Sequence, residues 1–183
     1  MSWSKHKDEF GKANIEQALF DFILDVLPEG KTILELGSGW GTTQLLKHWK
    51  VISVEHNKVW WDKLTNPCIK APLTEHKAIR NHSGPMKWYD RDILKPALKG
   101  LEYDLLLIDG PVGDTRCGVV KYIDLFNPEA IMVFDDLQRK ADRAIINSVS
   151  AKLHKPYVMY PYTEGKPFGV INDPCKWSRN DPS

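Results

Sequence analysis

The stretch ILELGSGWGTT, from Ile33 to Thr43, changes character at its fifth residue. Its first four residues are apolar apart from Glu35, and together with the residues before them they predict a buried strand over Lys31–Leu36. Three glycines then follow with single residues between them: Gly37, Gly39 and Gly41. Glycine lets a chain turn sharply and lets a ligand come close to the backbone. We therefore expect either a plain tight turn or a ligand-binding loop at the end of this strand.

Strand-like and helix-like segments alternate on both sides of this stretch. Further strands are predicted at Val51–Glu55, Pro67–Leu73, Leu105–Ile108 and Ala130–Phe134, and helices at Asn14–Leu27, Thr42–Trp49, Asn57–Leu64, Asp114–Phe126 and Gln138–Leu153. Two last strands, Tyr157–Tyr162 and Phe168–Ile171, have no helix between them, which predicts an antiparallel pair. The polar segment Thr74–Gly100 is expected to be a loop with a short helix over Ile93–Leu98.

This alternation predicts an α/β fold. Parallel strands separated by helices form a sheet that is covered on both faces. We expect a Rossmann-like, mostly parallel, seven-stranded sheet that ends in a C-terminal antiparallel hairpin. A chain of 183 residues suits one domain, here residues 1–183. The polar ends, residues 1–12 and 174–183, are expected to be flexible.

Composition excludes several classes of protein. The chain is 42% hydrophobic and 27% charged with a net charge of +1, so it lacks the basic excess of a dedicated nucleic-acid binder. No apolar stretch approaches the roughly 20 residues of a membrane span. The three cysteines (Cys68, Cys117 and Cys175) are odd in number and far apart, which indicates reduced thiols rather than disulfides or a zinc site. A cytoplasmic protein is expected.

Acidic residues stand at the ends of the predicted parallel strands: Glu35, Glu55, Asp109, Asp135 and Asp136. Ligands of such sheets bind outside the carboxyl ends of the strands, so these five acids predict one site. The glycine spacing is neither that of a phosphate-binding loop, which needs a Lys followed by Ser or Thr, nor that of a nicotinamide fingerprint. Glu55 follows about 20 residues later, where it can accept hydrogen bonds from both hydroxyls of a ribose. Glu35 suits a cationic amine, so adenosine joined to an amino acid is the favoured ligand.

Two motifs carry a family resemblance. ILELGSGWGTT resembles the first motif of class I S-adenosylmethionine-dependent methyltransferases, and VISVEHN resembles their second, within a similarity that extends over Asn14–Ile171. The resemblance implies that the turn from Gly37 to Gly41, Ser38 included, lies under the methionine end of S-adenosylmethionine. It further implies that Glu55 holds the ribose, that His56 flanks the adenine, and that Pro72 and Leu73 border the adenine.

The stretch LLLIDGPVGDTR, Leu105–Arg116, is the candidate acceptor region. The resemblance implies that Asp109 faces the methyl donor and acceptor, while Gly110-Pro111 shapes the turn and Arg116 opens the next helix at the pocket rim. The family members that methylate nucleic-acid amines have an aromatic clamp here that this chain lacks. Asp109 or Asp135 is a candidate general base. Arg116 and Arg139 are candidates to clamp an acidic group of the acceptor, or are solvated charges at helix starts.

The stretch VFDDLQRK adds a candidate metal site. Asp109, Asp135 and Asp136 offer oxygen ligands for Mg²⁺ or another divalent cation, which small-molecule O-methyltransferases of this fold often hold at these strand ends. The alternative is that Asp135 or Asp136 caps the Gln138–Leu153 helix.

These patterns lead to one favoured function and two alternatives. The favoured function is S-adenosylmethionine-dependent O-methylation of a hydroxylated small molecule or sugar, with or without a divalent cation. The pair of motifs IDGP…R and FDD…R also looks similar to glucuronoxylan O-methyltransferase-type proteins, which methylate sugar hydroxyls. The alternatives are a nucleic-acid methyltransferase and a non-catalytic domain that binds S-adenosylmethionine or a partner. A nucleic-acid partner is disfavoured by the near-neutral charge, and no membrane association is expected.

Overall fold

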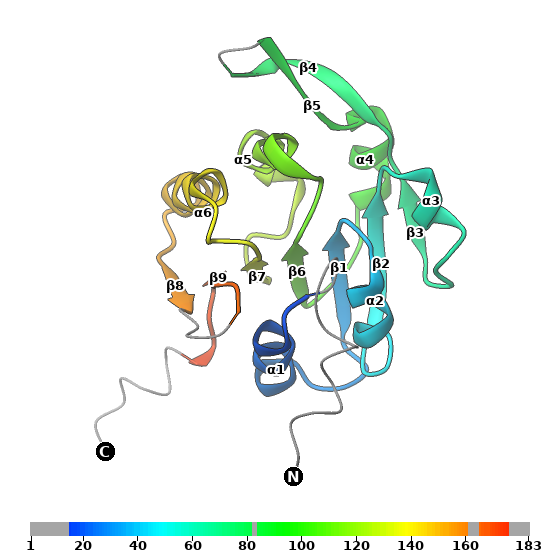
Figure 1. Cartoon of the computed structure of the whole chain (residues 1–183), viewed down its shortest axis with the longest axis vertical. Helices are drawn as coiled ribbons and strands as arrows, with labels where there is room; N and C mark the ends of the chain where they lie inside the picture. Colours follow the sequence, from blue (N-terminus) through cyan, green and yellow to red (C-terminus); the bar gives the residue numbers. More distant parts are fainter. Residues whose placement is uncertain (1–14, 82–83, 161–164, 176–183) are drawn as a thin grey trace.

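A computed structural model describes residues 15–81, 84–160 and 165–175 (Figure 1). The expected flexible start (1–12) and most of the expected flexible end (174–183) lie outside the described residues. In the part of the chain that is described, no helix combines the length and the apolar character that crossing a membrane requires.

A seven-stranded sheet forms the centre of the molecule, with the strand order β3-β2-β1-β6-β7-β9-β8. Five strands are parallel: β1 (Thr32–Leu36), β2 (Lys50–Glu55), β3 (Cys68–Lys70), β6 (Leu105–Ile108) and β7 (Ile131–Phe134). β9 (Phe168–Ile171) pairs antiparallel with β7 and with β8 (Tyr157–Tyr160). The predicted fold class, including its terminal antiparallel pair, is confirmed.

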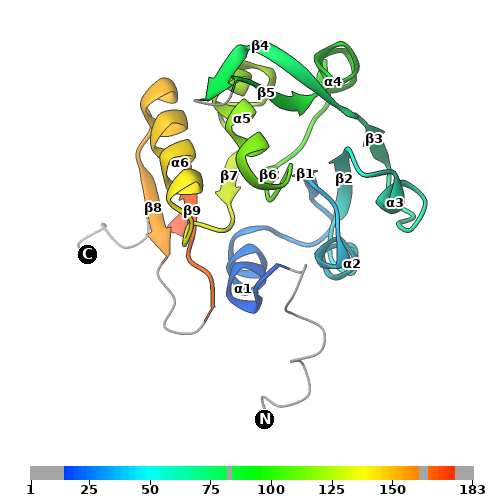
Figure 2. The same cartoon turned by 45° about the horizontal axis from the view of Figure 1, so that its top comes forward.

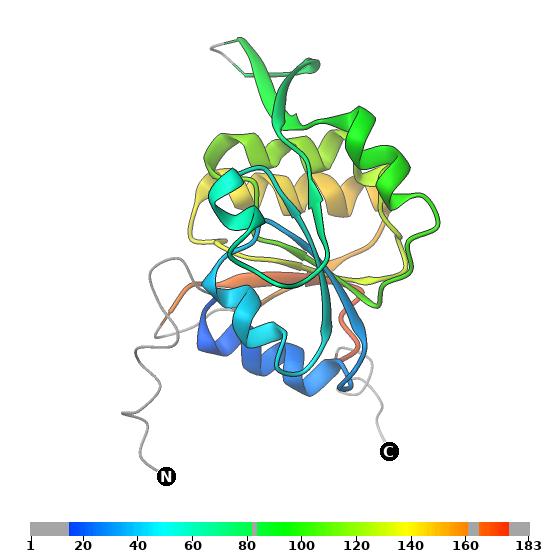
Figure 3. The same ribbon diagram turned by 90° about the vertical axis from the view of Figure 1, so that its right-hand side faces the viewer.

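Helices cover both faces of the sheet (Figures 2 and 3). One face packs against α1 (Gln17–Val26) and α2 (Trp40–Leu45), and the other against α4 (Arg91–Leu98), α5 (Gly118–Lys121) and α6 (Lys140–Leu153). Successive strand residues enter opposite cores, as the alternation of side chains along a strand requires: Ile33 lies in one apolar cluster, and Leu34 and Leu36 lie in the other. Glu35 therefore points toward the α2 face.

The prediction of a loop over Thr74–Gly100, after the third strand, is wrong. The strands β4 (Leu73–Asn81) and β5 (Gly84–Tyr89) pair as an antiparallel hairpin, which extends from the body above α4 and α5 (Figure 1). Its base is part of the core, because Trp88 and Tyr89 are fully buried. The backbone N–H of Asp90 donates to the carbonyl of Pro72 (2.8 Å), so the residues just before and just after the hairpin lie side by side. Proline and charged residues in this segment obscure the strand pattern.

The prediction of one continuous helix over Asp114–Phe126 is also wrong. The chain forms a 3-10 helix (Gly113–Cys117), the single turn α5 and a second 3-10 helix (Ile123–Leu125). Gly118 explains the tight path, since a Cβ there would lie 2.2 Å from the Trp88 ring. The remaining predicted helices are present with shifted ends: α2 begins at Trp40, and α3 (Lys58–Trp61) is a single turn.

Candidate active site

The carboxyl ends of four neighbouring strands bring the predicted acids to one edge of the sheet. The order β2-β1-β6-β7 places Glu55, Glu35, Asp109 and Asp135 on adjacent strands or just beyond them. Parallel hydrogen bonding continues past the strand ends, where Asp109 N–H donates to Leu36 O (3.1 Å) and Asp135 N–H donates to Ile108 O (3.2 Å). The acids predicted to share a site therefore do lie along one edge.

The glycine loop passes very close to the turn after β6. A Cβ on Gly110 would lie 2.6 Å from Gly37 Cα, so the two backbones pack directly on each other. Gly37 also has φ +86°, a conformation that side chains rarely adopt. A Cβ on Gly41 would lie 2.9 Å from the nitrogen of Ile15. Chain packing thus requires glycine at Gly37 and Gly41, while residues 37–39 remain partly exposed.

Glu35 lies beneath this loop and is 2% exposed. Its carboxyl group accepts hydrogen bonds from Thr42 Oγ1 (2.9 Å) and Ser53 Oγ (2.8 Å), and Thr42 Oγ1 in turn accepts from Gly39 N–H (3.0 Å). Burial raises the pKa of Glu35 to about 8, against the opposing effect of these hydrogen bonds. The side chain therefore joins β1, β2 and the glycine loop from below.

Glu55 holds the same loop from the side of β2. Its Oε2 accepts from Ser38 N–H (2.7 Å) and Ser38 Oγ (3.0 Å). Its Oε1 accepts from Asn57 N–H (2.5 Å) and lies 3.0 Å from His56 Nδ1. Burial alone would raise the pKa of Glu55, but the contacts from His56, Asn57 and Ser38 outweigh it and lower the pKa. The carboxylate stays ionised, with hydrogen bonds from Ser38 and Asn57 and the His56 ring beside it.

The other two residues predicted to border the adenine lie farther along the chain. Pro72 is exposed and lies between β3 and β4, and Leu73 is the first residue of the hairpin. The His56 side chain is 20% exposed and its ring lies 6.2 Å from that of Tyr89 in an edge-on arrangement. The N–H of Ala71, the residue before Pro72, donates to the Glu55 carbonyl (3.0 Å), so the chain enters this segment next to the end of β2.

The second group of acids lies at the ends of β6 and β7. Carboxylate oxygens of Asp109, Asp135 and Asp136 lie within 4.8 Å of one another. Burial, with the charges of Asp109 and Asp136, raises the pKa of Asp135 to about 7. Burial also raises the pKa of Asp109 despite the nearby Arg116. Asp109 is the accessible member, with 35% of its side chain exposed.

Arg116 lies inside this group rather than at the rim that the sequence suggested. It is 3% exposed. Its guanidinium donates to Asp142 Oδ1 (3.1 Å), to the backbone carbonyls of Asp135 (3.3 Å) and Asp109, and lies 3.4 Å from Asp136 Oδ2. A buried arginine with several acidic partners holds elements together, and here it joins the ends of β6 and β7 to α6. Asp142, in the first turn of α6, was not predicted as part of the site.

Two further cations reach the same acids. Arg139 Nη1 lies 2.8 Å from Asp136 Oδ2, and Lys166 Nζ lies 3.3 Å from Asp136 Oδ1. Lys166 comes from the loop between β8 and β9, which carries no motif that would single it out. The capping alternative for Asp135 and Asp136 is wrong, because α6 begins at Lys140 with Arg139 as its N-cap.

The residues fit a divalent cation poorly. Asp136 Oδ1 already meets Gln138 Nε2 (3.1 Å) and Lys166, and its Oδ2 meets Arg139 and Arg116. A carboxylate has about four acceptor positions, so these four donors fill them. A metal ion would have to displace cations that the chain itself supplies, and we assign no step to one.

Comparison with solved structures identifies the architecture. TomG, an O-methyltransferase from Streptomyces achromogenes involved in tomaymycin synthesis and solved in complex with SAM, superimposes with a TM-score of 0.55 at 14% identity, covering 91% of this chain and 84% of that one. The chain has the class I methyltransferase fold.

Two other structures agree with this assignment. Cofactor-bound Rv0187 from MTB gives a TM-score of 0.53 at 15% identity, covering 89% of this chain and 83% of that one. The C-terminal domain of precorrin-6Y C5,15-methyltransferase from Rhodobacter capsulatus gives a TM-score of 0.50 at 9% identity, covering 89% of this chain and 91% of that one. No family profile and no curated protein matches the sequence. The class I methyltransferase fold therefore rests on the structure.

Proposed function

We propose that the protein is an S-adenosylmethionine-dependent methyltransferase that methylates a hydroxyl group of a small molecule or sugar. The observation that carries the proposal is the layout of the sheet edge. The glycine loop and Glu55 form one half of it, and the accessible Asp109 stands on the neighbouring side, where Gly37 and Gly110 are in direct contact. This layout suits a donor and an acceptor that must meet.

At the donor half, Glu55 has two kinds of partner. The N–H groups of Ser38 and Asn57 are fixed by the backbone, whereas Ser38 Oγ and His56 Nδ1 belong to side chains that can turn away. The two hydroxyls of a ribose would take the places of these two side-chain atoms. The backbone contacts would remain and keep the carboxylate in position.

At the acceptor half, Asp109 is the general base. S-adenosylmethionine supplies a methyl group on a positively charged sulfur, and transfer forms the new O–CH₃ bond while the C–S bond breaks and its electron pair stays on sulfur. Asp109 takes the proton of the acceptor hydroxyl. A raised pKa makes its carboxylate a better base than an ordinary aspartate. Most of the acceleration would come from holding the two reactants in line.

Calorimetric titration tests the donor half. S-adenosylmethionine should bind the wild type in a 1:1 ratio, and Glu55→Gln should weaken binding at least tenfold, because an amide replaces one acceptor oxygen with a donor. Glu102→Gln, an exposed substitution outside the site, should bind as the wild type does. Absence of binding to the wild type would overturn the proposal.

Transfer of a labelled methyl group tests the acceptor half. Pools of sugars, hydroxy acids and phenols are incubated with the protein and labelled donor, and Asp109→Asn should reduce product formation at least 100-fold with the donor affinity retained. Labelling of RNA or DNA but of none of these pools would overturn the hydroxyl assignment. Donor binding without transfer to any pool would favour a binding domain instead.

A further inference from the structure

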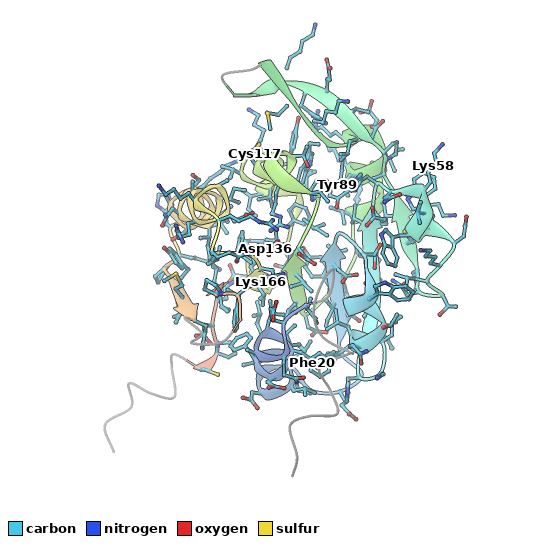
Figure 4. The ribbon with its side chains drawn as sticks, in the orientation of Figure 1. Phe20, Lys58, Tyr89, Cys117, Asp136 and Lys166 are labelled. Carbon is cyan, nitrogen blue, oxygen red and sulfur yellow. The ribbon has the colours of Figure 1, made fainter. Side chains whose placement is uncertain are left out.

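Lys166 contacts the acidic group at Asp136 although it comes from a distant part of the chain. Its ammonium lies 3.3 Å from Asp136 Oδ1 and 3.7 Å from Glu16 Oε1, just before α1. Figure 4 shows Lys166 beside Asp136, between α6 and α1. The side chain is 34% exposed, so it is held by acids and still meets solvent.

The charges of this group nearly balance without any added ion. Four carboxyl groups (Asp109, Asp135, Asp136 and Asp142) face three cations (Arg116, Arg139 and Lys166). Isolated carboxylates this close together would repel one another strongly, and each cation removes part of that cost. The group therefore differs from an open set of acids that awaits a metal.

Only part of this charge can meet an acceptor. Arg116, Asp135, Asp136 and Asp142 are buried. The accessible members are Asp109 (35%), Lys166 (34%) and Arg139 (49%). Arg139 reaches Asp136 and Asp142 through the same nitrogen, Nη1, and its position at the N-cap of α6 is the most exposed of the three. Lys166 is the cation that carries three N–H donors on one atom, of which Asp136 engages one, while Glu16 Oε1 lies 3.7 Å away.

We propose that Lys166 is the resident cation of the acceptor site: its ammonium, held by Asp136, supplies the positive charge that a divalent metal ion would bring and donates a remaining N–H to the acceptor oxygen. The inference rests on the proposed function and deepens it. Lys166 stabilises the negative charge that develops on the acceptor oxygen as Asp109 removes its proton. Methyl transfer is then independent of divalent metal, and Asp136, one of the metal ligands predicted from the sequence, serves to hold a lysine.

Metal binding in the absence of donor and acceptor tests this directly. Calorimetric titration of Mg²⁺ and luminescence titration of Tb³⁺ are carried out on the wild type, Lys166→Met and Lys166→Arg. Removing the ammonium frees one acceptor position of Asp136 Oδ1, which still accepts from Gln138 Nε2, and leaves the four carboxyl groups with two cations, Arg116 and Arg139. Lys166→Met should therefore bind Tb³⁺ at least tenfold more tightly than the wild type, and Lys166→Arg should resemble the wild type. Lys155→Met, which removes a lysine paired with Glu129 instead, is the matched control.

The catalytic arm uses the wild type with EDTA and with added Mg²⁺. Product formation should be unchanged by either, Lys166→Met should reduce kcat at least tenfold with donor affinity retained, and Lys166→Arg should restore most of it. Stoichiometric binding of Mg²⁺ to the wild type that Asp135→Asn abolishes would overturn the inference, whatever the fate of Lys166→Met. Failure of the wild type to bind S-adenosylmethionine would overturn the proposed function instead, and the metal titrations would still report on Lys166.

Discussion

Glu35→Gln should make the protein more resistant to alkaline pH. The carboxyl group of Glu35 is buried, and its pKa rises from 4.5 to about 8 in the folded protein. An acid whose pKa is raised by folding contributes its full stability at pH values below its pKa in the unfolded chain. That stability is lost as the pH rises to its pKa in the folded protein. The stability contributed by Glu35 is therefore lost between pH 4.5 and pH 8. Between pH 5 and pH 8 the free energy of unfolding should fall by about 3.5 kcal/mol through this one group.

Glutamine resembles the neutral acid in shape and has no proton to lose. The hydroxyls of Thr42 and Ser53 can each donate or accept, so both can adapt to an amide. Urea unfolding of wild type and Glu35→Gln at pH 5, 6.5 and 8 measures the difference between the two proteins, in which the parallel contribution of Asp135 cancels. Relative to the wild type, the free energy of unfolding of Glu35→Gln should rise by about 3.5 kcal/mol from pH 5 to pH 8. Parallel pH profiles for the two proteins would refute the reasoning, and Glu102→Gln should follow the wild type.

Two further substitutions test the packing and charge balance behind the site. Gly118→Ala would place its Cβ against the buried Trp88 ring, so the melting temperature should fall by an amount equivalent to about 1–3 kcal/mol, whereas Lys121→Ala on the same turn should have little effect. Arg116→Met leaves buried aspartates without their central cation and should cost about 3–5 kcal/mol at pH 7.5. Because protonation of those aspartates relieves the repulsion, the loss measured by urea unfolding should be smaller at pH 5, and an equal loss at both pH values would contradict the charge argument.

The sheet could be predicted from the sequence because its strands are short apolar runs bounded by glycine, proline or acids. The five acids could be predicted as neighbours for the same reason, since parallel strands end at one edge. What Arg116 does could not be predicted, because its burial depends on α6 and on the end of β7. Lys166 was missed because its partner Asp136 lies 30 residues earlier and only the return of β9 beside β7 brings them together. The hairpin was missed because proline and charged residues interrupt the strand pattern, although Met86 and Trp88 are buried on either side of the exposed Lys87.

The hairpin of β4 and β5 leaves and rejoins the body at a single backbone hydrogen bond between Asp90 and Pro72. The central sheet is therefore complete without the outer part of this excursion, and no strand of the sheet changes its neighbours if the outer part is lengthened or shortened. Among proteins of related sequence, differences in length should concentrate at this point. The residues at its base should vary less, because Trp88 and Tyr89 also fill the interior against α5 and the end of β2.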